Sequence, residues 1–556
     1  MPKLARRKVT KPISPRVVAC TIALACIAIF GAVIRYDFVS WDDNFNIVNN
    51  HRLLHGSIGY FWKHAYFRFY TPVCYTVWSA LASLGPSPAP SIFHTANVAL
   101  HVFNGWQVYC ILRHLLQGSS DGSPADAPAV SWAAAAGAVL FCVHPLQVET
   151  VAWVSGMRDV LSAALALAAV RIYLSGSTVL RDYGATAFYI LAALSKLSIV
   201  TLPLGLLVLE VGWLRRHYKD ALRRLLPLLI ASIPITFIAI GAQPASEQTH
   251  WEPHLVLRPL IAIDSLGFYL SKLFWPAHLA VDYGRTPRWV LDSSAYLGTG
   301  LVLTIFAVAL AVFVRRGGRA VVVGPLFALV VLTPVLGFVP FDFQAISSVA
   351  DRYMYLPLFG ISLTLAYFIA RRPFALVLLA ASIILILLGG RAFARVAVWE
   401  NDRTLFTAWI HDNPWSRQGY DGLGAIAYAE RDYPKAELLY RKALSVSLDP
   451  VPLGNLGHAL NEQHKYEQVI AEVEPALHDR EFLEQNRTRG GHLVGAYVAV
   501  GFAHEALGQV AEGYAFYCRG VSLAPSDGWL AQHLKHSREL LGLAPGAEDQ
   551  CLRPEP

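Results

Sequence analysis

Charged side chains are scarce in this chain: Asp, Glu, Lys and Arg make up 15% of its 556 residues, whereas a globular protein has about 25%. Hydrophobic residues make up 55%, more than a soluble protein can bury, which excludes an ordinary soluble enzyme. The charge is also uneven, because residues 17–399 form a series of apolar runs and residues 400–556 are polar. The sequence therefore predicts a membrane body followed by a soluble tail.

Cysteine is also infrequent, with seven residues in the chain. Four of them lie within apolar runs, where cysteine serves as a small hydrophobic side chain: Cys20, Cys26, Cys110 and Cys142. This placement excludes a disulfide framework, although Cys518 and Cys551 share the tail and are a possible pair, and no cysteine spacing indicates a metal site. The net charge of +7 comes from short basic clusters beside the apolar runs, so it indicates membrane orientation and not nucleic-acid binding.

Eleven apolar runs are predicted to be membrane spans: 17–33, 92–115, 131–145, 159–174, 184–199, 200–214, 224–242, 295–314, 320–339, 353–370 and 374–391. Residues 1–16 carry six Lys and Arg residues, so the positive-inside rule places this N-terminus in the cytoplasm. A cleavable signal peptide is the alternative. The first run is longer than the usual apolar region of about 7–15 residues and lacks a small-residue cleavage site, which favours a retained span.

Counting from a cytoplasmic N-terminus places four basic turns on the cytoplasmic side, in agreement with the positive-inside rule: 175–183, 215–224, 315–319 and 371–373. Segment 258–276 would break this count if it crossed the membrane. Its Asp264, Lys272 and aromatic cluster predict a re-entrant or interfacial helix on the outer side, and the alternative is that it crosses while another segment does not. The count brings the tail to the outer face, although Arg391 and Arg395 mildly oppose this orientation.

Residues 400–544 repeat a pattern of small residues where two helices touch, with large residues between them. Gly424, Gly457 and Gly501 occupy comparable places, at steps of 33 and 44 residues, so the middle unit is degenerate and holds an insertion near 478–490. The pattern is typical of tetratricopeptide helix-turn-helix units, of which about three make a stable stack. The concave face of such a stack binds peptides, which predicts docking of an acceptor or partner protein. The alternative is a rigid lid or folding platform, and residues 545–556 are predicted to be a flexible tail.

Two adjacent carboxylates, Asp42 and Asp43, follow the first span directly and begin a predicted outer loop over residues 36–91. Paired acids at a membrane boundary are costly unless water or a partner stabilises them. A solvated loop is the simplest interpretation. Against it, the flanking sequence is aromatic and apolar, and a paired acid lets one carboxyl hold a raised pKa for general-base chemistry while the other stays ionised.

Further polar side chains lie at later boundaries of the predicted spans. His94, Asn97, His101 and Asn104 share one helical face, where they either bond to neighbouring helices or line a site. The remaining candidates are His144, Glu149, Arg158, Lys196, Asp351, Arg352 and Tyr353. In the predicted topology they meet Asp42 and Asp43 at the outer face, where the three cations are expected to bind phosphate. Snorkelling at span ends is the alternative.

The joint order of five strings and the repeat tail resembles the transmembrane and tetratricopeptide-repeat O-mannosyltransferases and their bacterial relatives. The strings are WDD at 41–43, FHTANVALHVFN, HPLQVETVAWVSGMRDVLS, LSKLSIVTLP and ADRYMYLP. The resemblance implies an all-α fold, a polytopic helix bundle of the C-type glycosyltransferases, and a polyprenyl-phosphate sugar donor. Residues 70–72, Tyr-Thr-Pro, depart from relatives that often carry an aromatic-Arg-Pro string in this loop.

The resemblance also implies roles for the candidate residues. Asp42 would be the general base and Asp43 its partner in positioning the acceptor. Arg158, Lys196 and Arg352 would hold the carrier phosphate. The residues expected to line the site are His94, Asn97, His144, Glu149, Asp351 and Tyr353.

The short basic N-terminus and compact tail look like those of a bacterial relative, which implies an undecaprenyl-type carrier, the inner membrane and a periplasmic outer face. The expected acceptor is a Ser or Thr hydroxyl of an exported protein. A glycan or lipid acceptor of the envelope is one alternative, and a transporter with partner-binding repeats is another, disfavoured because the body shows no internal repeat. Asp42, Asp43 and the carrier phosphate are a possible ligand set for Mg²⁺ or Mn²⁺.

Overall fold

The computed structural model describes residues 11–67, 69–118, 127–176, 178–242, 253–317, 320–371, 375–486, 490–524 and 528–543. These residues are helical apart from turns and one isolated bridge between Tyr66 and Phe69, and they contain no strand. The all-α prediction is therefore confirmed for them. The predicted basic segment up to residue 10 and the flexible tail 545–556 lie outside the described residues.

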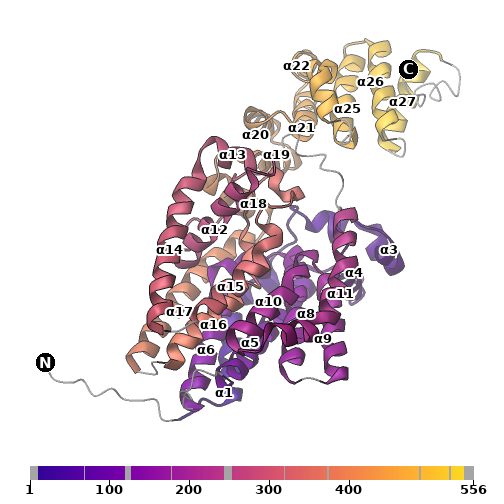
Figure 1. Cartoon of the computed structure of the whole chain (residues 1–556). Helices are drawn as coiled ribbons and strands as arrows, with labels where there is room; N and C mark the ends of the chain where they lie inside the picture. The colour runs from indigo at the N-terminus through magenta and orange to yellow at the C-terminus, as the bar shows by residue number, and fades with distance from the viewer. Residues whose placement is uncertain are drawn as a thin grey trace. The chain divides into compact units, whose positions relative to one another are not determined.

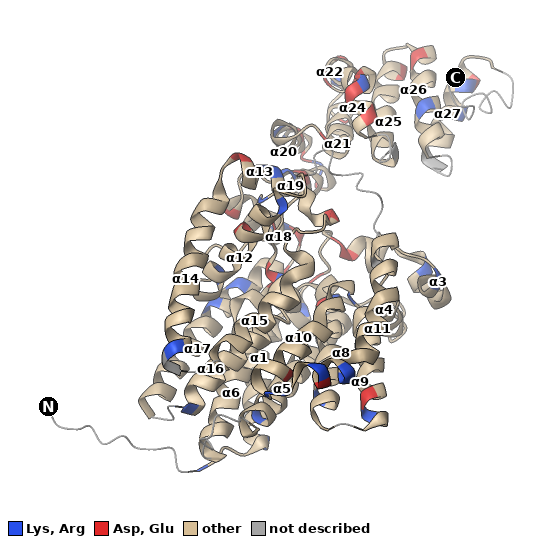
Figure 2. Cartoon of the chain, in the orientation of Figure 1, with Lys and Arg blue, Asp and Glu red and all other residues tan. Residues whose placement is uncertain are grey.

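The chain divides into two compact units, of which the first reaches Leu405 and the second begins at Phe406 (Figure 1). A helical segment occurs at each of the eleven predicted spans. These helices are α1 (Pro15–Phe30), α5 (Pro90–Gln117), α6 (Ala127–Val143), α8 (Met157–Leu174), α9 (Val179–Ala193), α10 (Leu202–Val208), α11 (Tyr218–Ala242), α14 (Ala295–Gly317), α15 (Ala320–Leu332), α16 (Leu358–Arg371) and α17 (Ala375–Val396). The long helices of this unit carry few charged residues between their ends (Figure 2).

Four helices among the described residues are long and apolar enough to cross a membrane. They cover Pro15–Arg35, Tyr218–Ala242, Ala295–Arg315 and Ala375–Trp399, and α6 with the bent segment after it makes a fifth if the pair is one span. Several of the other predicted spans contain helices shorter than the roughly 20 residues that a span needs, because turns and 3₁₀ segments interrupt the apolar runs. The run predicted at 184–199, for example, is helical only to Ala193 before the chain turns at Lys196.

Small residues let the helices of the first unit approach closely. At the crossing of α15 and α16, a methyl group added to Gly324 would collide with the carbonyl oxygen of Gly360. Such contacts are how helices pack in an apolar environment, where the packing of small residues replaces the hydrophobic effect. They fix the position of the turn between α15 and α16, which carries Arg352.

The predicted outer loop forms three short helices, α2 (His51–Leu54), α3 (Ile58–Lys63) and α4 (Pro72–Ala82). An aromatic core holds them together, with the rings of Phe61 and Tyr75 stacked at 4.3 Å. The same core includes Val154 and Met157. It therefore joins the outer loop to the start of α8.

Segment 258–276 forms α12 (Arg258–Phe274), which packs along α14. Its Asp264 is fully buried and accepts hydrogen bonds from Nε of Arg285 over 2.9 Å and from the hydroxyl of Thr299 over 3.2 Å. A buried carboxylate requires such partners. Two further short helices complete this part of the chain, α7 (Val148–Ala152) and α13 (Pro287–Asp292).

The second unit begins within α18 (Asp402–Asp412) and consists of helix pairs. Its helices are α19 (Arg417–Ala429), α20 (Tyr433–Val446), α21 (Pro450–Asn461), α22 (Tyr466–Glu472), α23 (Glu474–His478), α24 (Arg480–Gln485), α25 (Gly490–Ala506), α26 (Val510–Leu523) and α27 (Gly528–Leu540). Gly424 faces the ring of Tyr440 and Gly501 faces the ring of Tyr517, whereas Gly457 faces Ala499 of α25. The first and third pairs thus share one internal contact that the middle pair lacks.

Candidate active site

The acidic pair lies in a turn between η1 (Gly31–Arg35) and η2 (Asn44–Val48). Two hydrogen bonds tie this turn to the segment after α17. The backbone N–H of Asp37 donates to the carbonyl of Glu400 over 3.0 Å, and that of Ser40 donates to the Asp402 carboxylate over 2.6 Å. The turn that carries the pair is therefore held in place by the far end of the first unit.

Asp43 is fully buried and uses both carboxylate oxygens within the protein. Oδ1 accepts from the backbone N–H and the hydroxyl of Ser155, over 3.0 and 2.6 Å, and Oδ2 accepts from the N–H of Val39 over 3.1 Å. Burial raises the pKa of Asp43 to about 7, although these hydrogen bonds oppose the shift. Asp43 therefore fastens the acidic turn to η4 (Val154–Gly156), the segment before α8.

Asp42 is the more open member of the pair, with 20% of its side chain exposed. Its Oδ2 lies 3.2 Å from Nη2 of Arg158. Burial raises the pKa of Asp42, and the positive charges of Arg158 and Arg352 oppose that rise. Because both cations act on one carboxylate, the predicted convergence of the acidic pair with distant cations is present in this structure.

Each of the three predicted phosphate ligands has an acidic partner. Arg158 of α8 pairs with Asp42, and Lys196, in the turn after α9, pairs with Asp159. Arg352 of η9 (Asp351–Met354) pairs with Glu149, whose Oε2 also accepts the backbone N–H of Arg352 over 2.9 Å. The cations thus meet as predicted but are neutralised by carboxylates, so an incoming phosphate would compete with acids already in place.

Aromatic rings lie against the cations. The guanidinium of Arg158 lies 5.0 Å from the ring centroid of Phe69, and that of Arg352 lies 4.2 Å from the centroid of Phe343. Nζ of Lys196 lies 5.4 Å from the Tyr353 centroid. Contacts of this kind stabilise a partly desolvated cation, and they hold the charged groups without consuming all their hydrogen-bond donors.

A small cavity of about 30 Å³ lies beside two of the cations. Its wall includes Asp159, Lys196, Arg352, Tyr353 and Tyr355. The two cations and the phenol groups are hydrogen-bond donors that suit phosphate oxygens. The cavity therefore gathers cationic and phenolic donors at one place.

Three of the expected lining residues lie behind the site and do not border this cavity. His94 bonds to the carbonyl of Asp37 (3.3 Å), Asn97 donates to that of Trp153 (2.8 Å), and His144 bonds to that of Leu273 (3.1 Å). All three are at most 1% exposed. They hold the backbone of the segments that carry the charged groups.

The other three expected lining residues are closer to the charges. Glu149 is the partner of Arg352, and Tyr353 lines the cavity. Asp351 points to the loop after α12, where its Oδ1 accepts from the hydroxyl of Tyr283 over 2.7 Å. Burial and the nearby Glu149 raise the pKa of Asp351.

The polar face of α5 serves mainly as a bridge between helices. Asn104 donates to the carbonyl of Val160 (2.9 Å) and to the hydroxyl of Tyr355 (3.0 Å), and His101 bonds to the same hydroxyl (2.8 Å). Of the two interpretations of this face, interhelical bonding describes these two residues. Their contacts orient Tyr355 in the cavity wall.

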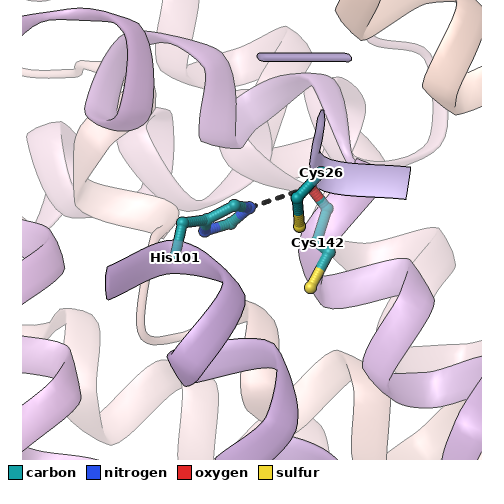
Figure 3. A group of neighbouring side chains, drawn as sticks. All are labelled: Cys26, His101 and Cys142. Atoms are coloured by element: carbon teal, nitrogen blue, oxygen red, sulfur yellow. Dashed lines mark hydrogen bonds between the residues drawn. The ribbon is translucent and has the colours of Figure 1, made fainter. Parts of the chain in front are cut away.

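One group of potential metal ligands with close spacing occurs among the described residues, formed by Cys26, His101 and Cys142. Figure 3 shows the imidazole of His101 bonded to the Cys142 carbonyl (3.1 Å), and its other nitrogen bonds to Tyr355 (2.8 Å). Because both ring nitrogens are engaged, we interpret this group as packing. At the acidic pair, both oxygens of Asp43 accept hydrogen bonds from the protein, whereas Asp42 uses Oδ2 toward Arg158.

The structure adds residues that sequence reasoning missed. Ser155 binds Asp43, Asp159 binds Lys196, and Asp402 holds the acidic turn. Ser155 and Asp159 flank Arg158 in the same string, so their proximity was a usable signal. Asp402 carries no such signal, because ten residues separate it from the last predicted span and it lies in none of the five strings.

No protein-family model matches the chain. Over 333 residues it is 24% identical to the Protein O-mannosyl-transferase F38B6.6 of Caenorhabditis elegans, a match that covers 56% of this chain and 45% of that protein. The chain thus spans less than half the length of this relative. Among solved structures, the APC/C hetero-tetramer Cut9-Hcn1 aligns over 94% of the chain at 12% identity, with a TM-score of 0.22 that carries no argument about the fold.

Proposed function

We propose that this protein transfers a sugar from a polyprenyl-phosphate carrier, of the undecaprenyl type, to a Ser or Thr hydroxyl of an exported protein. The observation that carries the proposal is the meeting of Asp42 with Arg158 and Arg352 beside a cavity lined by Lys196. The similarity to an O-mannosyl-transferase supports transfer to a hydroxyl of a protein.

In this proposal Asp42 is the general base. It takes the proton of the acceptor hydroxyl as that oxygen attacks the anomeric carbon of the sugar. A new bond forms between the hydroxyl oxygen and the sugar. The bond between the anomeric carbon and the phosphate oxygen breaks, and the carrier phosphate leaves with the electron pair.

Arg158, Lys196 and Arg352 stabilise the negative charge that grows on the leaving phosphate. Their present partners are carboxylates, so a bound phosphate draws on the same donors. When Arg158 turns from Asp42 toward the phosphate, Asp42 loses a charge that lowers its pKa. Donor binding in this way makes Asp42 a stronger base at the time it is needed.

The proposed membrane arrangement places the N-terminus in the cytoplasm and the site on the periplasmic face of a bacterial inner membrane. The eleven helical segments of the first unit lie in the membrane, some as full spans and some as broken ones, and α12 is re-entrant or interfacial. The repeat unit lies on the periplasmic side. The polar residues of the site then face the side on which exported proteins are available.

The test uses the full chain reconstituted in vesicles with a radiolabelled polyprenyl-phosphate sugar and a mixture of exported proteins. We expect label on protein, and a loss of about 10²–10⁴-fold in Asp42→Asn, the range that a general base contributes. Asp37→Asn is the matched control, because Asp37 precedes the acidic pair in the same turn and is exposed to solvent. Full transfer by Asp42→Asn would refute the assignment of the base, and label only on glycan or lipid would refute the protein acceptor.

A further inference from the structure

A groove of about 700 Å³ lies on α8, beside the two helices that pack against it, α5 and α9. Figure 1 shows these three helices together in the first unit. The volume is that of a small-molecule site, for which about 300–1,000 Å³ is usual. Most of the lining comes from α5 and α8, and α9 contributes Phe188. The groove is separate from the candidate active site, because none of its lining residues borders the cavity beside Lys196.

The floor of the groove is one face of α8. Most of its lining residues on this helix recur every three or four positions, which puts them on one face: Leu161, Ala164, Leu165, Ala168, Arg171, Ile172 and Ser175. Ala164 and Ala168, one turn apart, leave the space that larger side chains would fill. Nε2 of Gln107 on α5 donates to the carbonyl of Ala164 over 2.9 Å and so ties the wall to the floor. The groove is therefore built by the packing of α5 on α8.

One end of the groove is basic, whereas the rest of the lining is apolar apart from Gln107. His114 and Arg171 stand at this end, in the last turns of α5 and α8, and both are exposed. The positive charge of Arg171 reaches into the groove, because it acts on the thiol of Cys110, another lining residue. The described lining contains no Asp or Glu. A ligand that fits this groove is therefore an apolar chain with an anionic end.

The acidic residues near this end of α8 are engaged by a different arginine. Arg224 donates to the carbonyl of Gly176, just after α8, over 2.9 Å. It also pairs with Asp182 over 3.5 Å and with Glu210 over 3.1 Å. Within the part of the chain that the structure describes, Arg171 forms no ion pair of its own. Its donors therefore remain for a ligand.

The depth of the groove matches one leaflet of a bilayer. Arg158 and Arg171 are thirteen positions apart on α8, which is about 20 Å at 1.5 Å per residue. In the proposed membrane arrangement Arg171 therefore lies toward the face opposite the candidate active site. From Leu161 to Arg171 the groove extends about 15 Å, half of a hydrocarbon core of about 30 Å. A single acyl chain from that leaflet can follow this path.

We propose that this groove binds one anionic phospholipid of the leaflet opposite the candidate active site. An acyl chain lies on Ala164 and Ala168, and the phosphate accepts hydrogen bonds from Arg171 and His114. The guanidinium presents a fork of N–H groups that matches phosphate oxygens, and basic pockets between membrane helices hold anionic headgroups in this way. A headgroup with net negative charge is preferred to a zwitterionic one, because the described lining offers no acid to an ammonium group. The inference rests on the proposed membrane arrangement and not on the transfer reaction.

The test measures lipid binding by the full chain in detergent micelles, with native mass spectrometry as the readout. The two probes are phosphatidylglycerol and phosphatidylcholine with identical acyl chains, so that they differ only in the headgroup. We expect phosphatidylglycerol to bind about fivefold more tightly, the effect of about one basic residue at an anionic lipid. Equal affinities of the two lipids for the wild-type chain would overturn the proposal.

Removal of the arginine tests the phosphate contact. Arg171→Gln should bind phosphatidylglycerol about fivefold more weakly than the wild-type chain does and leave binding of phosphatidylcholine unchanged. Arg223→Gln is the matched control, because the side chain of Arg223 is 82% exposed on α11, outside the groove. It loses the same charge and should keep the wild-type preference. An Arg171→Gln variant that keeps this preference would refute the phosphate contact and with it the proposal.

Filling the groove tests the place of the acyl chain. Ala168→Phe puts a ring on the groove floor and should weaken binding of both lipids. Ala187→Phe adds the same ring at an exposed position of α9 outside the lining and should not. Thermal unfolding of both variants reports that the chain is folded, and Arg171→Gln, which changes an exposed side chain, decides the test if Ala168→Phe does not fold. Unchanged lipid binding by a folded Ala168→Phe variant would contradict the proposed place of the chain.

A polyprenyl phosphate is the competing ligand, since it also joins an apolar chain to a phosphate. Addition of undecaprenyl phosphate should leave bound phosphatidylglycerol in place, because the carrier phosphate is proposed at Arg158, about 20 Å away along α8. Displacement of the phospholipid would assign the groove to the carrier and overturn the inference. The binding assay contains no sugar and no acceptor, so a failure of the proposed transfer reaction leaves its result unaffected.

Discussion

Arg158 donates a hydrogen bond over 3.2 Å to Asp42, although 116 positions separate the two residues in the sequence. This pair joins the turn after α1 to the start of α8, and the buried Asp43 fastens the same two segments through Ser155. The two adjacent acids therefore have different surroundings. Asp43 is fully buried among protein partners, whereas 20% of the Asp42 side chain is exposed.

The first prediction concerns Arg158→Gln. Arg158 lowers the pKa of Asp42, so its removal raises that pKa. A general base works only when ionised, and the acidic limb of the pH–rate profile should therefore move to higher pH in this variant. Transfer should also fall by about 10²-fold, since one phosphate ligand is lost.

The measurement is the rate of transfer in vesicles as a function of pH at saturating acceptor. Arg52→Gln is a suitable control, because Arg52 lies in the outer loop that carries Asp42 but stacks on Tyr60, 3.7 Å from its ring centroid. An unchanged acidic limb in Arg158→Gln would show that Asp42 is not the titrating base.

The positions of the helices were largely predictable from the sequence. Long apolar runs predict helices, and every predicted span contains one. The breaks within them were less visible, because a turn such as that at Lys196 has no glycine or proline to mark it, and the ion pair of Lys196 with Asp159 is a tertiary contact. The roles of polar residues within the spans were also ambiguous. His94 and His144, for example, bind backbone carbonyls that the sequence does not identify.

The convergence of the charged residues followed from topology, but their pairing did not. Glu149 and Arg352 are 203 positions apart, and no periodicity relates them. Positive-inside reasoning placed the cations on one face and said nothing of the carboxylates that neutralise them. Sequence thus predicted where the charges gather, whereas the choice of partners depends on side-chain packing.

The second prediction concerns the fastening of the acidic turn. Ser155→Ala removes a hydrogen bond to the buried Asp43 and should lower the free energy of unfolding by about 1–3 kcal/mol. Ser162→Ala is the matched control, because the buried Ser162 hydroxyl has no hydrogen-bond partner. Thermal unfolding in detergent measures both, and equal losses in the two variants would contradict the role of Ser155.

The third prediction concerns pH. The pKa of Asp43 is about 7 in the folded state, above its usual value of 3.8. The folded state therefore binds this proton more tightly than the unfolded state, and the contribution to stability is lost as pH rises from about 4 through about 7. In Ser155→Ala the hydrogen bond that lowers this pKa is absent, so the loss should extend to higher pH.

Unfolding midpoints measured at several pH values test the direction of this pH dependence of stability. The contribution of Asp43 should be larger at pH 5 than at pH 8, as judged from the difference between wild type and Asp43→Asn. A difference that grows with rising pH would mean that Asp43 is stabilised as a carboxylate, and the pH argument would fail.

The fourth prediction separates stability from donor binding at Arg352. Glu149→Gln leaves a buried guanidinium without its charge partner and should destabilise the chain by about 3–5 kcal/mol. The double variant Glu149→Met with Arg352→Met removes both charges and should regain much of that stability. It should nevertheless bind the donor poorly, because a phosphate ligand is missing.

Thermal unfolding and binding of the labelled donor provide the two readouts. A double variant that is as unstable as Glu149→Gln would mean that the pair does not act as a unit. One that binds donor as well as wild type would remove Arg352 from the phosphate site while leaving its structural role intact.

The last prediction concerns Lys196, which lines the cavity and pairs with Asp159. Lys196→Gln should weaken donor binding by about tenfold, because a charge-assisted contact to phosphate is worth more than a neutral one. Lys63→Gln, at the exposed end of α3, controls for the loss of one positive charge.

Asp159→Asn should act in the opposite direction, since it frees Lys196 from its carboxylate and leaves the cation to the phosphate. Tighter donor binding in Asp159→Asn together with weaker binding in Lys196→Gln would establish that acid and phosphate compete for the same amine, whereas parallel losses in both variants would mean that the pair only shapes the cavity.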